Sequence, residues 1–167
     1  AMNTDAQALA IAEAPVRVQL GEKATKGLGV GGDHNFGRKA AEENHDEIKE
    51  IVSGADMIFI TCGMGGGTGT GSAPVIAEIA KQSGALTIAV VTKPFAFEGN
   101  RRCQVAEEGI INLLGKVDTL IIIPNDRLLS LCDQKTGVDN AFKLADDVLR
   151  HGVQAISEVI TVPGMIN

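Results

Sequence analysis

A chain of 167 residues with 44% hydrophobic and 22% charged residues has the composition of one soluble globular domain. Its net charge of −6 argues against nucleic acid as a partner, because a nucleic-acid surface needs clustered Lys and Arg. Three widely spaced cysteines predict neither a zinc site nor a disulfide framework. The sequence has no run of 18 apolar residues, so direct membrane insertion is not expected.

The first residues predict a turn between a strand and a helix. Asn3, Thr4 and Asp5 have side chains that can bond local backbone groups, so a plain helix cap explains them as well as a ligand contact does. Residues 16–20 alternate apolar and polar side chains and predict a short strand. Neither end of the chain has a polar tail, and we expect residues 1–167 to be part of a longer protein.

Glycine is concentrated in two windows: five of the 20 glycines lie in residues 27–37 and six in residues 63–71. The first window contains the pattern GxGxxG, but a dinucleotide fingerprint should follow a strand directly, and residues 21–26 intervene. We therefore predict a mobile loop over a ligand, with His34 as an exposed loop histidine rather than a metal ligand. A helix with a charged, solvated face is predicted for residues 38–52.

The second glycine window follows an apolar strand, residues 57–61, and precedes an apolar-periodic segment that ends near Ala80. A strand, a glycine loop and a helix start in this order direct backbone N–H groups and a helix dipole at one point, which suits a phosphate. Pro74 is expected in the first helical turn. No GxxxxGK[ST] pattern is present, so the phosphates must be held by backbone groups and by the hydroxyls of Thr68 and Thr70.

Two further apolar strands are predicted at residues 85–92 and 119–123, each followed by a helix. Strands that alternate with helices predict an α/β fold with a doubly wound parallel sheet, in which ligands bind beyond the carboxyl ends of the strands. Glu98, Arg102 and Asn125 come just after strand ends, so we expect them beside the glycine loop. Glu98 and Arg102 are also four residues apart, and a surface ion pair is the alternative.

A short helix at residues 127–131 is followed by a long one at about 138–160, whose apolar stripe predicts a course through the centre of the protein. Phe142 and Asp146 lie one turn apart on this helix. An aromatic ring and a carboxylate at this spacing can stack a base and accept two N–H bonds, which guanine offers and adenine does not. Core packing is the alternative for Phe142 taken alone.

The whole set of motifs resembles one family. Residues 63–71, GMGGGTGTG, resemble the tubulin/FtsZ signature GGGTGTG[ST] in its bacterial form. Further segments that fit in order are NTDAQAL at 3–9, VTKPF at 91–95, FEG at 97–99, IPND at 123–126 and ADDVL at 145–149. The resemblance covers essentially the whole chain, and it implies that residues 1–167 are part of a Rossmann-like GTP-binding domain.

The resemblance implies a cytoskeletal GTPase that binds GTP or GDP, with Mg²⁺ held through the nucleotide phosphates. Its subunits would assemble with one another, head to tail, into the septal ring of a dividing cell. Self-association and cell-division accessory proteins are thus the expected partners, and the cytoplasm at the division site is the expected location.

The resemblance also assigns individual residues to parts of the nucleotide. The implied phosphate contacts are Gly67, Thr68 and Gly69, with Gly65, Gly66 and Thr70 in the same loop and Asn3, Asp5 and residues 29–32 in flanking loops. The implied ribose contacts are Glu98 and Arg102, and the implied guanine contacts are Phe142 and Asp146, with Asn125 at the neighbouring strand end.

The chain departs from the family pattern at three places. The first strand and first phosphate loop of the family should precede Ala1, and residues 33–36 (DHNF) stand where the family has Asn-Pro and an acid. The acidic loop that activates water in the next subunit is expected after Asn167, so no catalytic residue is assigned in this chain. We expect the isolated chain to bind GTP weakly or not at all and to have no useful GTPase activity.

Two other classes of function stay open at this point. A dinucleotide-dependent oxidoreductase would need its GxGxxG pattern directly after a strand. A non-catalytic binding or regulatory module on the same fold would account for the absence of the acidic loop.

Overall fold

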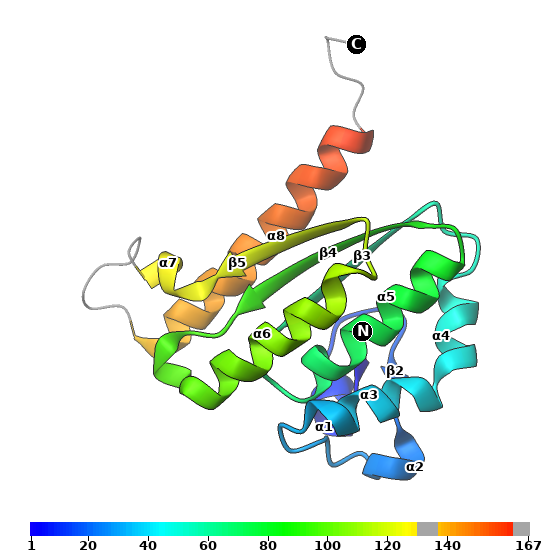
Figure 1. Cartoon of the computed structure of the whole chain (residues 1–167), viewed down its shortest axis with the longest axis horizontal. Coiled ribbons are helices and arrows are strands. Elements are labelled where there is room, and N and C mark those ends of the chain that lie inside the picture. The colour runs from blue at the N-terminus through cyan, green and yellow to red at the C-terminus, as the bar shows by residue number, and fades with distance from the viewer. Residues whose placement is uncertain (130–136, 162–167) are drawn as a thin grey trace.

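The computed structural model describes residues 1–129 and 137–161, and it contains two parallel sheets (Figure 1). The larger sheet has the strand order β3–β4–β5, formed by Met57–Gly63, Leu86–Lys93 and Thr119–Pro124. The smaller sheet pairs β1 (Met2–Asn3) with β2 (Val18–Gln19), which is shorter than the strand predicted at residues 16–20. The predicted α/β fold with parallel strands is confirmed.

Helices flank the larger sheet on both faces. In chain order they are α1 (Ala6–Ala10), α2 (Glu22–Thr25), α3 (His34–Glu43), α4 (His45–Val52), α5 (Thr68–Gln82), the 3₁₀ turn η1 (Ala96–Glu98), α6 (Asn100–Leu114), α7 (Asn125–Leu129) and α8 (Val138–Thr161). Helices α5 and α6 cover one face and α8 covers the other (Figure 1). None of the helices in the described part of the chain has the length and apolarity to cross a bilayer.

The central strand β4 is buried on both faces, as its nearly continuous apolar sequence predicts. Ala89 and Val91 pack in a core cluster with Ala73 and Ile110 from α5 and α6. Val90, which alternates with them, faces α8, where a side chain on Gly152 would meet it in ordinary van der Waals contact. Full burial of one such valine stabilises the fold by roughly 1.5–3 kcal/mol.

The strand register places the carboxyl ends of β3, β4 and β5 together. Gly63 at the end of β3 pairs with Thr92 near the end of β4, and Thr92 pairs with Ile123 of β5. The segments that follow the three strands therefore start from the same edge of the sheet.

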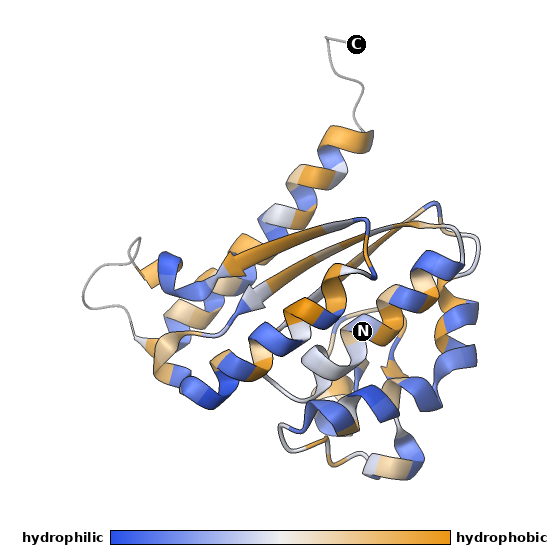
Figure 2. Ribbon diagram, in the orientation of Figure 1, coloured by the Kyte–Doolittle hydropathy of each residue, from blue (hydrophilic) through white to orange (hydrophobic). Residues whose placement is uncertain are grey.

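Helix α8 is present where the long helix was predicted, and its position at the centre of the protein stays a prediction. Its last turns extend past the sheet (Figures 1 and 2), and Val159 is 82% exposed. A 24-residue helix is about 36 Å long, whereas an eight-residue strand such as β4 spans about 27 Å. The apolar stripe is thus longer than the sheet surface that could bury it.

The single helix predicted for residues 38–52 is wrong, because the structure has two helices that meet at Asn44. The side chain of Asn44 accepts a hydrogen bond from the Gly21 backbone N–H and donates one to Glu47. Helix α3 also starts inside the predicted loop, at His34, because Asp33 accepts hydrogen bonds from the next helical N–H groups and caps it.

The position of Pro74 is a second correction. It is the seventh residue of α5, not a first-turn residue, because the helix already begins at Thr68. The glycines before it serve helix packing: a Cβ on Gly71 would collide with the His34 carbonyl oxygen, and one on Gly37 with the Gly67 carbonyl oxygen. Helices α3 and α5 thus approach with their backbones in contact.

The short helix predicted at residues 127–131 is present as α7, which begins two residues earlier, at Asn125. Its predicted end at Leu131 lies outside the described residues, as do Cys132 and residues 162–167.

Candidate functional site

The loop after β3 has a shape that only glycine can adopt. Gly65 has φ +100°, and its N–H donates a 2.9 Å hydrogen bond to the Thr70 hydroxyl. A Cβ on Gly65 would lie 2.8 Å from the Arg102 carbonyl oxygen, which leaves no space for a side chain. The loop is therefore held between the start of α5 and α6.

Helix α5 starts without a side-chain cap. Its N-cap residue is Gly67, which cannot accept hydrogen bonds from the first helical N–H groups. These free donors and the positive end of the helix dipole favour an anion. The neighbouring Thr68 hydroxyl lies 2.6 Å from the hydroxyl of Thr4, so the loop after β1 contacts this helix start.

Thr70 corrects one predicted role. Its side chain is 2% exposed, and its hydroxyl accepts the Gly65 N–H, so it shapes the glycine loop instead of facing a ligand. The glycine-loop pattern predicted that this hydroxyl contacts phosphate. The prediction was wrong because a sequence pattern does not reveal the direction in which a helical side chain points.

A cavity of about 410 Å³ lies at the carboxyl ends of the strands, and we call it the strand-end cavity. It is lined by Thr61, Cys62, Gly63, Met64, Gly66, Thr92, Pro94, Glu98, Arg102, Asn125, Phe142, Ala145, Asp146 and Leu149. Six of these, from four different segments, were predicted site residues. The predicted convergence is therefore present, and its volume is in the range of small-molecule sites.

Glu98 and Arg102 form an ion pair, which the sequence analysis gave as the alternative to a ligand contact. Both residues also line the strand-end cavity. Arg102 donates to one Glu98 carboxylate oxygen at 2.6 Å, and the Phe95 backbone N–H donates to the other at 2.9 Å. The Glu98 side chain is 10% exposed, whereas that of Arg102 is 57% exposed. The carboxylate is thus fixed, and the guanidinium keeps donors that face solvent.

Phe142 and Asp146 lie on the cavity side of α8. Phe142 is 39% exposed, while Ala141 and Ala145 beside it are buried with Phe95 and Leu128. On this face of α8 the two alanines provide the buried contacts, so core packing alone does not explain the partly exposed Phe142 ring.

Asn125 carries a polar atom without a partner. The residue is 4% exposed, its Oδ1 accepts no hydrogen bond, and it lines the strand-end cavity. A buried acceptor left unsatisfied costs about 1–3 kcal/mol, so a ligand donor that reached it would be favoured.

A second cavity of about 620 Å³ separates β1 from β3, and we call it the β1–β3 cavity. It is lined by Asn3, Thr68 and Gly69 among others, and it shares residues 61–63 with the strand-end cavity. Asp5 does not line it, because its carboxylate accepts the N–H groups of Gln7 and Ala8 and caps α1. For Asp5 the plain helix cap is the better interpretation.

Cys62 lines both cavities but has no nucleophilic character. Burial raises the pKa of its thiol to about 12, so it stays protonated at neutral pH. Among residues 1–129 and 137–161, no group of three His, Cys, Asp or Glu could hold a metal ion.

The first glycine window packs against the second. A Cβ on Gly67 would lie 2.5 Å from a methyl group of Val30 and 3.0 Å from the Gly32 carbonyl carbon. The pattern GxGxxG follows α2, not a strand, which argues against the dinucleotide fingerprint.

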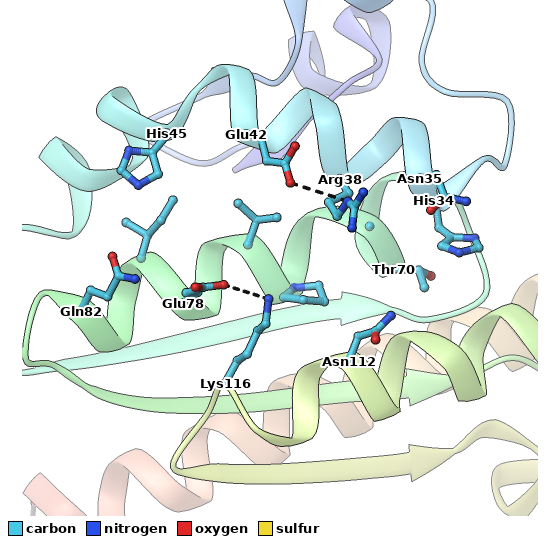
Figure 3. A pocket seen from close by; sticks show the side chains of 14 residues that line it. His34, Asn35, Arg38, Glu42, His45, Thr70, Glu78, Gln82, Asn112 and Lys116 are labelled. Atoms are coloured by element: carbon cyan, nitrogen blue, oxygen red, sulfur yellow. Dashed lines mark hydrogen bonds and ion pairs between the residues drawn. The ribbon is translucent and has the colours of Figure 1, made fainter.

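A third cavity of about 360 Å³, the helix cavity, lies between α3, α5 and α6 (Figure 3). Its walls include His34, Arg38, Glu42, Glu78 and Lys116. His34 is 24% exposed and lies 3.5 Å from Glu108, so it is a partly buried helical residue and not an exposed loop histidine.

Sequence reasoning missed two groups next to the strand-end cavity. Phe95 and Phe97 pack against Phe142, and Asp126 accepts a hydrogen bond from the Ala96 N–H. The spacing Phe-x-Phe directly after a strand, and an acid directly after Asn125, were the available signals.

Comparison with known proteins supports the family resemblance. Residues 1–133 match the family model described as Tubulin/FtsZ family, GTPase domain. A structure described as an empty FtsZ dimer from M. jannaschii is 49% identical, with a TM-score of 0.94, over 99% of this chain and 48% of that one.

Two CetZ structures from Haloferax volcanii are also similar. GDP-bound monomeric CetZ1 is 26% identical over 89% of this chain and 47% of that one, with a TM-score of 0.78. CetZ2, described as a GTPγS-bound protofilament, is 23% identical over 98% and 50%, with a TM-score of 0.82, which shows a common fold. The chain spans about half the length of these relatives. The family-model match over most of the sequence shows that this chain belongs to the tubulin/FtsZ family.

Proposed function

We propose that this chain is the nucleotide-binding part of a GTPase whose subunits assemble head to tail into a cytoskeletal polymer. The observation that carries the proposal is the strand-end cavity, where six predicted site residues meet beside the uncapped start of α5. The 49% identical FtsZ structure is described as a dimer, which supports self-association.

Each part of the nucleotide has a matching set of groups. Phe142 would stack guanine, and the two carboxylate oxygens of Asp146 would accept its two Watson–Crick N–H groups. Arg102, held by Glu98, would donate to the ribose, and a ribose or base donor would satisfy the Asn125 Oδ1.

The phosphates would lie at the start of α5. Backbone N–H groups from Gly66 to Gly69 and the Thr68 hydroxyl would hold them without a lysine, and Asn3 is close on the other side of the β1–β3 cavity. Mg²⁺ would be bound through the phosphate oxygens, where it neutralises developing charge during phosphoryl transfer.

No described residue is assigned as catalytic. Hydrolysis is proposed to need acidic residues supplied across the head-to-tail interface by another subunit, so a lone subunit turns over negligibly. The septal ring, its accessory proteins and a cytoplasmic location belong to the same proposal.

Nucleotide titration tests the base assignment. We expect weak binding by this chain, in which GTP and GDP shift the amide NMR signals of the strand-end cavity at lower concentration than ATP. ITP lacks the exocyclic amine and so one of the two N–H donors. It should shift the signals at a concentration between those needed for GTP and for ATP. Asp146→Ala should abolish the preference for GTP over ATP. We expect GTP affinity to fall roughly 10- to 100-fold, because hydrogen bonds to charged groups are worth about 1.5–3 kcal/mol.

The matched control is Asp147→Ala, which removes an exposed carboxylate at the next position of α8, 3.7 Å from Arg150. It should leave the order of the nucleotides unchanged. Equal affinity for GTP and ATP in the wild type would refute the guanine site, and an equal loss in both variants would attribute the effect to net charge.

A further inference from the structure

Three phenylalanines form one cluster at the rim of the strand-end cavity. The rings of Phe95 and Phe97 are stacked, with centroids 4.9 Å apart and an interplanar angle of 11°. The Phe142 ring is nearly perpendicular to both, with centroid distances of 5.3 Å to Phe95 and 6.3 Å to Phe97 and interplanar angles of 89° and 87°. Edge-to-face contact with two parallel rings restricts the plane that the Phe142 ring can adopt.

Phe97 lies in the 3₁₀ turn η1 and Phe95 is its N-cap residue, and hydrogen bonds hold this turn at two points. Glu98 accepts the N–H of Phe95 and so closes the turn on itself. Asp126, 30 residues further along the chain, accepts the N–H of Ala96 at 2.9 Å. The second bond joins the turn to α7, an element that packs against α8.

Phe95 is fully buried with Leu128 of α7, whereas Phe97 is 54% exposed. Burial therefore fixes the first ring of the pair but not the second. The position of Phe97 depends on the backbone of the turn, which Asp126 holds from outside.

We propose that Asp126 is a positioning residue for the base: by tying η1 to α7 it fixes Phe97, and through Phe97 the plane of Phe142, for stacking the nucleotide. The proposal rests on the proposed function for the nature of the ligand. The contacts between the rings do not depend on it.

The test compares Asp126→Ala with Asp126→Asn in the full chain. Alanine removes the acceptor, whereas asparagine keeps a carbonyl oxygen in the same place and removes only the charge. Asp139→Ala is the control, because Asp139 is also an exposed acid in the first turn of a helix. The chain has five Phe and no Tyr or Trp, so the aromatic NMR spectrum is simple enough to follow each ring.

We expect Asp126→Ala to raise the exchange rate of the Ala96 amide roughly fivefold, as expected for one net hydrogen bond, and to weaken the Phe97–Phe142 nuclear Overhauser contact. Asp126→Asn and Asp139→Ala should leave both within about twofold of the wild type. GTP affinity should fall roughly two- to tenfold in Asp126→Ala alone, the range for one aromatic contact.

Unchanged ring contacts in Asp126→Ala would overturn the proposal. It would also be overturned if the rings moved but GTP affinity stayed the same, or if Asp126→Asn lost the ring contacts as Asp126→Ala does. Absence of nucleotide binding by the wild type would instead refute the proposed function, while amide exchange and ring contacts would still decide whether Asp126 orients Phe142. If the alanine variant does not fold, Phe97→Leu tests the same link and should reduce GTP affinity to the same extent.

Discussion

The strand-end cavity and the helix cavity are similar in size, but they differ in how their polar groups are satisfied. In the helix cavity, Arg38 pairs with Glu42, and Lys116 pairs with Glu78 (Figure 3). In the strand-end cavity, the Asn125 Oδ1 lacks such a partner, and the loop residue Gly66 leads from this cavity to the start of α5, which has no side-chain cap. Unsatisfied groups, not volume, distinguish the strand-end cavity as the candidate ligand site.

We expect the two cavities to be coupled through the backbone contact between α3 and α5. Gly71 lines the helix cavity, and in the same helix turn Thr68 and Gly69 line the β1–β3 cavity, which shares residues 61–63 with the strand-end cavity. A change in the α3–α5 contact should therefore affect both cavities, while changes in side chains of one should leave the other intact.

The largest effect is expected for Gly71→Ala. The added Cβ would collide with the His34 carbonyl oxygen, which is backbone and cannot rotate away. We expect a loss of about 3 kcal/mol in the free energy of unfolding, measured by urea denaturation, together with loss of nucleotide binding.

Gly115→Ala is the matched control, because a Cβ there meets nothing within 4 Å and its φ of −87° suits alanine. It should change stability by less than about 0.5 kcal/mol. Equal stability of the two variants would show that α3 and α5 are not in backbone contact.

Asn125→Leu should separate stability from binding. Replacing this buried side chain, whose Oδ1 has no hydrogen-bond donor, with an apolar side chain of similar size should raise the free energy of unfolding by about 1 kcal/mol. The same change should weaken nucleotide binding measured by titration, because the ligand donor loses its acceptor.

Asn112→Leu changes the same residue type in the helix cavity and should leave nucleotide affinity unaltered. A loss of stability in Asn125→Leu would mean that the side chain is structurally satisfied, and the contrast between the cavities would fail.

The smallest effect is expected for Glu78→Gln in the helix cavity. The hydrogen bond and charge of Lys116 hold the pKa of Glu78 below its usual range. A lowered folded-state pKa contributes stability above the unfolded-state pKa and loses it as pH falls through the folded-state value.

Glu78→Gln should therefore cost a few tenths of a kcal/mol at neutral pH, since the pair is exposed, and nothing in acid below the lowered pKa. Urea denaturation at several pH values, with high salt to screen the pair, measures this difference. A difference that persists in acid would exclude the ion pair as its cause.

Much of the fold and part of the site could be predicted from local patterns. The strands β3–β5 and the helix at 138–160 followed from hydrophobic periodicity, and the convergence of Glu98, Asn125 and the glycine loop followed from the rule for parallel sheets. These predictions succeed because periodicity and strand direction are properties of the chain itself.

The tertiary structure alone decided what several individual residues do. Thr70 shapes the loop, Asp5 caps α1, and Gly71 allows α3 to approach α5. Asp126 has its partner 30 residues away in the chain. Such roles depend on which side chain or backbone group of a distant segment lies within hydrogen-bond or van der Waals distance. Sequence spacing determines local conformation, but distances between remote segments are set only when the whole core packs.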